Sequence, residues 1–547
     1  MKRILKLALP RTGIIGLLKY VCLGILSGLC SFLFINTVTR VVTLIIAGEY
    51  TVSKEYMILF TCIILAFMWV RRTLSLAIIH LSQTLFWSLR KEILSLVLKA
   101  DYQQLAGRRT DVHAAVVSDV NILTNASMGI IDFFTAAILA VSCLVYLATI
   151  SMLLFGITLV IALLGITVYR LRARANVRNF QQARALETSF QENFNAILNG
   201  FKEIYMEPEK GRYIFNEKIG KIATEAFRNN TKAYTGFLNN QITGQVLFYI
   251  LISSILLVFS VTLNIPSGNT VSFVFTLLYL LGAIETIMVL LPNLVRARVA
   301  SNHLMDLKTK LEETDYHTHS LNGNPFTGGF EQIVIRGLEF HYIAKEEKAF
   351  SVGPVNFDIA KGEIVFIYGG NGSGKTTFMH TVLGLHIPTA GQIWLNGVKV
   401  TEDNYADYRA MFAVVFSDFY LFNDIAGVQE VDLAQWNYYL QLFELEGKVT
   451  LEGRTYSTTS LSTGQRKRLA LITALMEGKP VLVIDEWAAD QDPHFRRKFY
   501  TEIIPMLKQE GITILAITHD DKYYHCADKL YKMDYGKLMV ENVSIYQ

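Results

Sequence analysis

The feature that most constrains this chain is a series of long apolar runs in its first half. Each run is long enough to cross a bilayer core of about 30 Å, which needs roughly 20 helical residues. An apolar content of 52% with only 18% charged residues is also typical of a membrane protein. We therefore predict a membrane domain of six helical spans within residues 1–302, followed by a soluble part. The runs lie at about 13–39, 56–80, 128–149, 151–170, 244–263 and 270–293.

The basic residues predict the orientation of the spans. They are concentrated in the two long connections, at about 81–127 and 171–243, whereas the opposite connections carry only Arg40 and Lys54. By the positive-inside rule, both termini and both long connections are expected to be cytoplasmic. The formal net charge of +4 is small for 547 residues, so a nucleic-acid partner is not expected.

Both long connections keep a helical pattern while becoming polar, which predicts helices that extend beyond the membrane. Turn residues interrupt each pattern once, at 101–107 and at 199–208. We expect a helix pair to reverse direction at each interruption, with a short helix there that contacts a soluble domain. An ordinary solvated loop is the alternative.

A phosphate-binding loop is predicted at Gly369–Thr377, which fits the pattern G-x-x-x-x-G-K-[ST] after an apolar strand. Its glycines let backbone N–H groups converge on an anion, and the helix that follows points its positive end at the same place. Lys375 is expected to meet the β- and γ-phosphates of ATP, and Thr376 to bind Mg²⁺. The predicted nucleotide ligands are Gly369, Gly370, Asn371, Gly372, Ser373, Gly374, Lys375, Thr376 and Thr377.

The rest of the soluble part predicts an α/β domain. Residues 303–329 lose the apolar periodicity and are predicted to be a linker, and 330–547 alternate between strand-like and helical stretches. This pattern indicates an α/β P-loop nucleotide-binding domain with a mainly parallel sheet. Asp485 and Glu486 end a buried strand, where such sheets place their chemistry. Asp485 is expected to bind Mg²⁺, and Glu486 to polarise the water that attacks the γ-phosphate.

Further motifs resemble those of ATP-binding-cassette exporters. Leu461-Ser-Thr-Gly-Gln465 is similar to their signature motif, with Thr463 where glycine is commoner. His519, after a strand, resembles their switch histidine, and Tyr342 resembles the aromatic residue that stacks on adenine. Together with the phosphate loop these motifs span about 340–520 in the family's order. The resemblance implies an ATP hydrolase coupled to transport, with ATP and Mg²⁺ as cofactors.

A narrower resemblance concerns the segment from Asp485 to Tyr500 and the segment from His519 to Tyr524. Both are similar to the bacterial cyclic-peptide exporter branch, which includes exporters of peptide siderophore precursors. That branch implies a multi-pass protein of the bacterial cytoplasmic (inner) membrane. The resemblance to the wider ATP-binding-cassette family implies a homodimer in which the signature of one copy faces the phosphate loop of the other, with export by alternating access. The resemblances imply further nucleotide ligands: Ser462, Thr463, Gly464 and Gln465 of the signature motif, and the D-loop aspartate Asp492.

One position departs from the family's pattern. Ser417 stands where most cassette proteins have a Gln that contacts Mg²⁺ and the lytic water. A serine is too short for the same reach, so either Asp418 takes the place of the Gln as a metal ligand or a water fills the gap. The stretch between Ser417 and Ser462 is also short for the family, which implies a reduced helical subdomain.

Three classes of function fit these features. ATP-driven export of a cyclic or modified peptide, for which a siderophore precursor is a candidate, is favoured by the branch resemblance. A flippase for a lipid-linked substrate is the alternative, because an apolar cavity suits either cargo. A sensor or channel that uses ATP only for gating is the third.

Glu285 is the candidate cargo-binding residue of the sixth span. A carboxylate in a span marks a functional site by default. At about 1.5 Å per residue, Arg71 and Arg72 lie about 23 Å along the second span and Glu285 about 23 Å along the sixth. We therefore expect a contact between Glu285 and these arginines in a central cavity open to a polar cargo. A fixed ion pair that locks the two helices together is the alternative.

Overall fold

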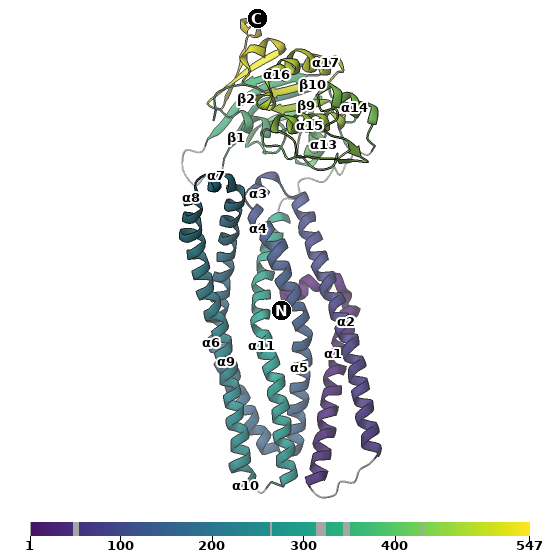
Figure 1. The fold of residues 1–547 in the computed structure, drawn as a ribbon, viewed down its shortest axis with the longest axis vertical. Helices are drawn as coiled ribbons and strands as arrows, with labels where there is room; N and C mark the ends of the chain where they lie inside the picture. Colours follow the sequence, from purple (N-terminus) through teal and green to yellow (C-terminus); the bar gives the residue numbers. More distant parts are fainter. Residues whose placement is uncertain are drawn as a thin grey trace. The chain divides into compact units, whose positions relative to one another are not determined.

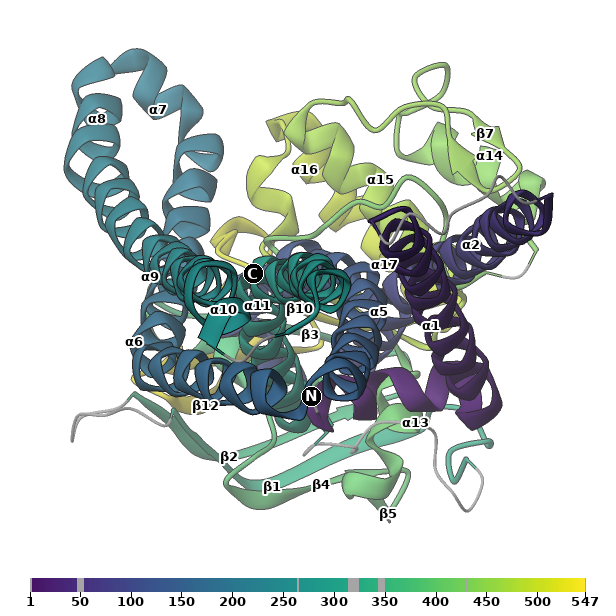
Figure 2. The ribbon, with the colours of Figure 1, turned by 90° about the horizontal axis from the view of Figure 1, so that it is seen from below.

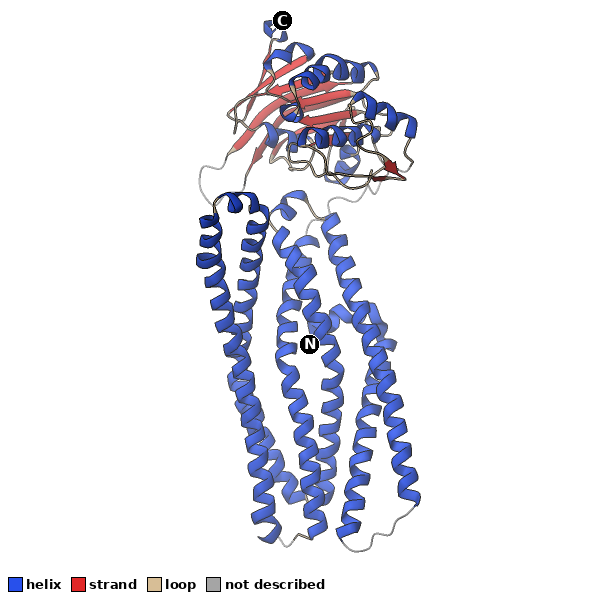
Figure 3. Ribbon diagram, in the orientation of Figure 1, coloured by secondary structure: helices blue, strands red, loops and turns tan. Residues whose placement is uncertain are grey.

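The computed structural model describes residues 2–46, 54–262, 265–312, 324–342, 350–428 and 430–546. It describes their side chains except at 2–18, 20, 21, 131, 170, 172–175 and 546. The chain divides into a helical unit, Met1–Leu98 with Gly107–Glu313, and an α/β unit, Lys99–Ala106 with Thr314–Gln547. Within the described ranges, all strands belong to the α/β unit (Figure 3).

Six long helices build the helical unit (Figure 1), and all six are long and apolar enough to cross a membrane. The six predicted spans are therefore confirmed. The long helices are α1 Lys2–Ile46, α2 Lys54–Lys99, α5 Val120–Ile150, α6 Met152–Asn199, α9 Gly220–Ser254 and α11 Ser267–Glu312. Shorter segments join them: α4 Arg109–Ala114, η1 Ala115–Asp119, α7 Phe201–Met206, α8 Pro208–Tyr213, η2 Ile214–Ile219, η3 Ile255–Phe259 and α10 Ser260–Thr262.

The long helices pack in pairs. Figure 2 shows α5 beside α11 and α6 beside α9. Phe248 on α9 and Leu277 on α11 lie in a buried apolar cluster together with Leu147 on α5. The apolar stripes of the spans therefore form an internal core, while many other apolar side chains of the same helices remain exposed, as lipid-facing side chains would be.

Short helices occupy both predicted reversals, so the solvated-loop alternative is wrong. At 101–107 the chain forms α3 Tyr102–Ala106, which belongs to the α/β unit. There Gln103 Nε2 lies 2.7 Å from His386 Nδ1, and the Tyr102 ring meets His386 edge-on. At 199–208 the chain forms α7, and Pro208 then begins α8 at the first turn, where its missing N–H costs no hydrogen bond.

The predicted linker begins too early. Helix α11 continues to Glu312 instead of ending at 302, because Leu304, Leu307 and Leu311 form a buried stripe at helical spacing. Charged residues between these leucines hide the stripe in the sequence. Residues 313–323 of the predicted linker lie outside the described residues.

The α/β unit contains a six-stranded sheet in the order β12-β11-β3-β10-β9-β6, in which only the β11–β12 pair is antiparallel. An antiparallel sheet in the order β2-β1-β4-β5 and a β7-β8 hairpin complete it. The strands are β1 Gln332–His341, β2 Ser351–Ala360, β3 Ile364–Tyr368, β4 Ala390–Leu395, β5 Val398–Lys399, β6 Phe412–Val415, β7 Leu451–Glu452, β8 Thr455–Tyr456, β9 Val481–Asp485, β10 Thr513–Ile517, β11 Lys529–Asp534 and β12 Lys537–Glu541.

Helices cover this sheet as expected for an α/β fold. Between Ser417 and Ser462 the described chain forms a single helix, α14, in line with the implied reduction of the helical subdomain. The helical segments are α12 Lys375–Val382, η4 Glu402–Asn404, α13 Tyr405–Arg409, α14 Leu433–Leu442, α15 Thr463–Met476, η5 Trp487–Asp490, α16 Pro493–Lys498, η6 Phe499–Ile503, α17 Ile504–Gln509, η7 Asp521–Cys526 and η8 Val543–Tyr546.

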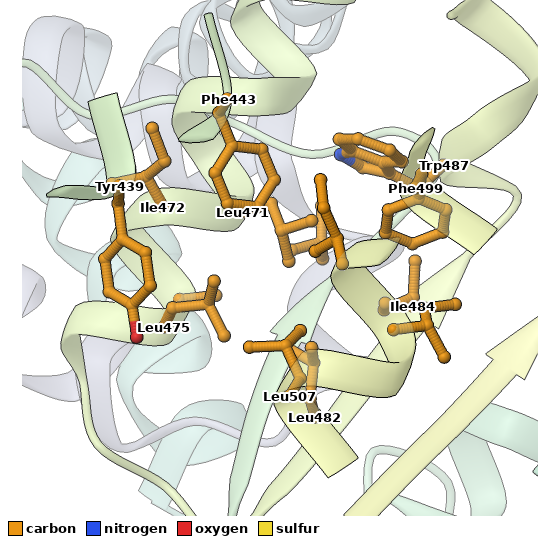
Figure 4. Close-up of a cluster of buried hydrophobic side chains, with 14 of the residues drawn as sticks. Tyr439, Phe443, Leu471, Ile472, Leu475, Leu482, Ile484, Trp487, Phe499 and Leu507 are labelled. Carbon is orange, nitrogen blue, oxygen red and sulfur yellow. The ribbon is translucent and has the colours of Figure 1, made fainter. Parts of the chain in front are cut away.

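A large apolar core lies against one side of the six-stranded sheet. Figure 4 shows Ile484 of β9 beside Phe499 and Trp487, while Leu475 of α15 lies beside Tyr439 on the other side of the same buried cluster. Every residue of β9 and β10 is buried, which is typical of central parallel strands covered on both faces. The core thus holds the ends of β9 and β10 in fixed positions.

Candidate functional site

The predicted catalytic residues meet at one edge of the six-stranded sheet. Strands β3, β6, β9 and β10 are parallel, so their carboxyl ends lie at the same edge. The phosphate loop follows β3, and Ser417 comes shortly after β6. Asp485 ends β9, and His519 follows β10. Residues that are far apart in the sequence are therefore brought together by the strand order.

The phosphate loop contains glycines in backbone conformations with positive φ, as its sequence predicts. Gly372 and Gly374 have φ values of 76° and 107°, a region that L side chains rarely adopt. A Cβ at Gly374 would lie 2.9 Å from the Phe350 ring, and one at Gly369 would collide with the carbonyl oxygen of Met533. The loop can therefore keep this shape only with glycine at these positions.

Lys375 is almost fully buried, with 6% of its surface exposed. Its Nζ donates to the carbonyl oxygens of Gly369 and Gly370 at 3.1 and 3.2 Å. The ammonium group is thus held inside the loop, where an anion enclosed by the loop would meet it. The hydroxyl of Ser373 is buried and has no hydrogen-bond partner in the described chain, so it is free for such an anion.

Glu486 has a strained backbone, with φ 46° and ψ 35°, which is uncommon outside glycine. Its N–H donates to Ile517 O at 3.0 Å, which ties β9 to β10 at this point. Its Oε1 lies 3.0 Å from His519 Nε2 and 3.9 Å from Lys375 Nζ. The structure therefore joins the three predicted catalytic residues in one cluster.

The neighbouring carboxylate, Asp485, is only 1% exposed. Burial raises its pKa, and hydrogen bonding from the Ser417 hydroxyl opposes this shift. Its Oδ1 is buried and has no partner within the described residues. A buried carboxylate oxygen without a protein donor fits a hard cation such as Mg²⁺, which prefers oxygen ligands. Asp485 and the Ser417 hydroxyl bonded to it are therefore suitable ligands, and the role of Thr376 stays a prediction.

The role of Asp418 as a metal ligand stays a prediction. The charge of Asp418 acts on His380: burial lowers the pKa of this histidine, and Asp418 opposes that shift. Ser417 and Asp418 are adjacent in a turn. Among the described residues, no group of three or more His, Cys, Asp or Glu side chains forms a metal site.

Tyr342 lies beside the phosphate loop. Its hydroxyl is 3.2 Å from Thr377 Oγ1, and its ring meets Phe340 edge-on with 5.1 Å between the ring centroids. The side chain is 44% exposed. An open aromatic face next to the loop is the geometry that stacking on adenine requires.

The signature segment begins a helix. Ser462 is the N-cap of α15, and it forms a reciprocal capping box with Gln465. Ser462 and Thr463 are exposed. A Cβ at Gly464 would lie 2.9 Å from Asp490 O, so this glycine permits a close approach of α15 to η5. The segment thus presents an exposed helix N-terminus, which suits an anion.

Asp492 has a structural role that its motif did not indicate. Its Oδ1 accepts from Phe495 N at 2.9 Å and caps α16, and its Oδ2 accepts from Arg468 Nη2 at 2.8 Å. The Phe495 N–H, with Arg468, holds the pKa of Asp492 below its usual range. Buried Arg468 also donates to Gln491 Oε1 at 2.9 Å. We did not predict a role for Arg468, because its partners lie 23 and 24 positions away.

The predicted contact of Glu285 with Arg71 or Arg72 is wrong. Glu285 Oε1 accepts from Gln245 Nε2 on α9 at 2.6 Å, and Arg71 instead pairs with Asp132 on α5 at 2.9 Å. Arg72 lies exposed on α2. Depth along a helix is only one of two coordinates, and the direction around the helix axis decides which neighbour a side chain meets.

Sequence comparisons agree with this geometry. The profile of the ABC transporter family matches residues 352–489, from β2 to η5. The ATP-binding protein SyrD of Pseudomonas syringae pv. syringae is 30% identical over 526 residues, which cover 94% of this chain and 92% of SyrD. The chain belongs to the ABC transporter family. It is an exporter-type ABC transporter, an ATP hydrolase coupled to transport with several membrane-spanning helices.

One further sequence relative and one solved structure resemble this ABC transporter. The ATP-dependent lipid A-core flippase of Burkholderia orbicola is 28% identical over 287 residues, which cover 50% of this chain and 46% of the flippase. A bacterial Atm1-family ABC exporter with ATP bound superposes with a TM-score of 0.79 over 97% of this chain and 94% of the exporter, at 15% identity. At that identity the structural likeness shows the shared fold.

Proposed function

We propose that this ABC transporter exports a cyclic or modified peptide across the bacterial cytoplasmic membrane as a homodimer, with siderophore precursors as candidate cargo. The observation that carries the ATP-driven part is the Lys375, Glu486 and His519 cluster beside the phosphate loop. The motif from Asp485 to Tyr500, which resembles the cyclic-peptide exporter branch, supports the cargo. The likeness to the ATP-binding protein SyrD over both units supports the ATP-driven part.

In this proposal each side chain of the sheet edge has one task. Lys375 and the loop amides hold the phosphates of ATP, and Tyr342 stacks on the adenine. Glu486 accepts a proton from the attacking water, and His519 fixes the orientation of the Glu486 carboxylate through the 3.0 Å contact. Asp485, Thr376 and Ser417 would hold Mg²⁺. The ion supplies charge stabilisation for the transferred phosphoryl group.

The homodimer follows from the exposed signature segment. Ser462, Thr463, Gly464 and Gln465 form the start of α15, where the N–H groups of Ser462 and Gln465 are used in the capping box. We propose that this positive helix end meets ATP held by the phosphate loop of a second copy. ATP binding would then draw two α/β units together. The contacts of Gln103 and Tyr102 hold α3 on the α/β unit, so this motion would reach α2 and α4. The membrane domain would then open alternately to the two sides of the membrane. The basic connections support cytoplasmic termini.

Transport into inverted membrane vesicles tests the proposed cargo. A labelled cyclic peptide should accumulate in vesicles that contain the parent protein and ATP, and should not accumulate with the Glu486→Gln variant. Absence of accumulation with the parent protein, under conditions where it hydrolyses ATP, would contradict peptide export.

A lipid-linked substrate is the second candidate, because half of the chain resembles a lipid A-core flippase. A fluorescent lipid-linked oligosaccharide in reconstituted vesicles distinguishes the two candidates. Its transfer between leaflets, together with no peptide accumulation, would favour the flippase.

A further inference from the structure

The helical unit contains a polar cavity of about 420 Å³. Its walls come from η1 and the start of α5, from the polar half of α6, and from single turns of α9 and α11. All of these residues lie outside the six apolar runs. The volume is within the range of cavities that hold small ligands.

Two facing helices supply polar stripes to its walls. Asn121 and Asn125 on α5 are four residues apart, and Arg184, Glu187 and Gln191 on α6 follow the same helical spacing. Helices that only pack together would place apolar side chains at these positions. The wall at Val117 and Ser118 also belongs to η1, a π-helical turn, and such turns occur frequently at functional sites.

The charges of the cavity differ in how they are compensated. Arg184 donates from Nε and Nη2 to the buried Asp119 carboxylate, both at 2.9 Å, and His303 Nδ1 lies 2.6 Å from the same carboxylate. Arg184 is therefore fixed and neutralised. Arg296 donates only to the neutral Tyr234 hydroxyl, at 2.9 Å.

The remaining polar groups of the walls differ in their pairing. Asn121 Nδ2 donates to Val117 O at 2.6 Å, so this amide nitrogen is already used. Within the described ranges Glu187 has no ion pair, and Gln191 Oε1 is buried without a hydrogen-bond partner. Among the described residues, the cavity therefore offers Arg296 as a cation without an ion pair, Glu187 as an anion without an ion pair, and carboxamides, which can donate and accept hydrogen bonds.

We infer that this cavity binds a short stretch of peptide that carries one carboxylate and one amine. Backbone amides of the ligand would pair with Asn121, Asn125 and Gln191, its carboxylate with Arg296, and its amine with Glu187. The two charges come either from the free ends of a linear peptide or from side chains of a cyclic one. This inference rests on the proposed peptide export, and it names the recognition site and the charge pattern of the cargo.

Photo-crosslinking of the full-length protein in lipid nanodiscs tests the site. The probe is the tripeptide Gly-photoleucine-Gly with free ends, and labelled residues are mapped by mass spectrometry. We expect labelling within 117–125 and 180–191. Unlabelled triglycine should compete at least about tenfold better than end-blocked N-acetyl-triglycine amide. A cyclic tetrapeptide with one Glu and one Lys, added as a competitor in the same assay, tests whether side-chain charges can replace the charges of free ends. Labelling elsewhere, or equal competition by the blocked peptide, would overturn the inference.

Matched variants on the same helices sharpen this test. Glu187→Gln and Arg296→Gln should each lower labelling by about tenfold. Glu192→Gln and Arg298→Gln change the same charges on α6 and α11 outside the cavity walls, and should leave labelling unchanged. Melting temperature and basal ATP hydrolysis, measured on all four variants, confirm that each is folded. Equal losses in both pairs would contradict the site.

The inference and the proposed function fail in different ways. Transport of a labelled cyclic peptide without specific labelling of the cavity would remove the cavity and keep peptide export. Specific labelling of the cavity by the tripeptide, without peptide transport, would keep the site and overturn the proposed export.

Discussion

The two units each bury a carboxylate, and the two carboxylates differ in their partners. Asp119 in the helical unit is 0% exposed and is held by Arg184 and His303. Asp485 in the α/β unit is 1% exposed, and one of its oxygens has no partner in the described part of the chain. A fully paired buried carboxylate is typical of a structural link, whereas an incompletely paired one is typical of a site that receives a ligand. The units thus place the same chemical group in opposite roles.

The largest expected effect concerns turnover in the α/β unit. Glu486→Gln should lower ATP hydrolysis by about 10²- to 10⁴-fold, because the amide cannot accept the proton of the attacking water. ATP binding should persist, since Lys375 and the loop are unchanged. Hydrolysis by the purified protein, together with equilibrium binding of labelled ATP, provides the measurement.

Lys375→Ala is the matched variant. It should also abolish hydrolysis, but through loss of nucleotide binding, because the ammonium held inside the loop is removed. Loss of ATP binding in Glu486→Gln, to the extent seen in Lys375→Ala, would contradict the separate roles of the two residues.

The second prediction compares the two buried carboxylates directly. Asp119→Asn leaves Arg184 without its anion and should destabilise the helical unit by about 3–5 kcal/mol. Asp485→Asn should not destabilise the α/β unit. Burial raises the pKa of Asp485, so protonation favours folding and this contribution is lost as the pH rises through the raised pKa. A neutral amide at 485 therefore removes an unfavourable charge at neutral pH.

Thermal unfolding of both variants and of the parent protein, at the same pH, measures this difference. Asp485→Asn should lose Mg²⁺-dependent hydrolysis while keeping its melting temperature. Similar losses of melting temperature in the two variants would show that both carboxylates are structural.

The sequence predicts the α/β site better than it predicts the helical unit, for a physical reason. In the α/β unit the chemistry-bearing residues directly follow strands, and parallel strands bring their carboxyl ends to one edge. The contact between His519 and Glu486 follows from that rule alone. In a long helix each side chain has a depth and a direction, and only depth can be estimated by counting residues. This is why the contact of Glu285 with Arg71 was wrong while the six spans were right.

The missed residues share a feature that explains why they were missed. Arg184 meets Asp119 across 65 positions, and Arg468 meets Asp492 across 24. Such pairs depend on how helices pack, which local patterns do not contain. The end of α11 was missed for the opposite reason. Its leucine stripe is local, but the intervening charged residues weaken the apolar signal.

The third prediction concerns Tyr342, the exposed aromatic residue beside the loop. Tyr342→Ala should weaken ATP binding by about 1–3 kcal/mol, as expected for loss of a stacking face. Tyr342→Phe keeps the ring and should retain the affinity, although it loses the hydroxyl contact with Thr377. Equal affinities in all three proteins, measured by titration with ATP, would leave Tyr342 with no role in adenine binding.

The fourth prediction separates Ser417 from Asp418. Ser417 bonds to Asp485, so Ser417→Ala should cost about 0.5–1.5 kcal/mol of Mg²⁺-dependent transition-state stabilisation. Asp418→Asn should have a smaller effect, because Asp418 acts on His380. The measurement is the Mg²⁺ concentration for half-maximal hydrolysis. A larger effect of Asp418→Asn would support Asp418 as the metal ligand.

The smallest expected effect returns to the membrane spans, where Glu285 and Gln245 join α11 to α9 by a 2.6 Å hydrogen bond. Hydrogen bonds between membrane helices contribute about 0.6 kcal/mol on average, because the separated helices find other partners. A double-mutant cycle with Glu285→Ala and Gln245→Ala, read from unfolding in detergent, should therefore give a coupling of about this size. If this bond only links two helices, then Glu285→Gln, which can still accept from Gln245, should leave cargo-stimulated hydrolysis unchanged. Loss of that stimulation with an unchanged melting temperature would instead place Glu285 in contact with cargo. A carboxylate of the helical unit would then bind a ligand, as we expect of Asp485 in the α/β unit.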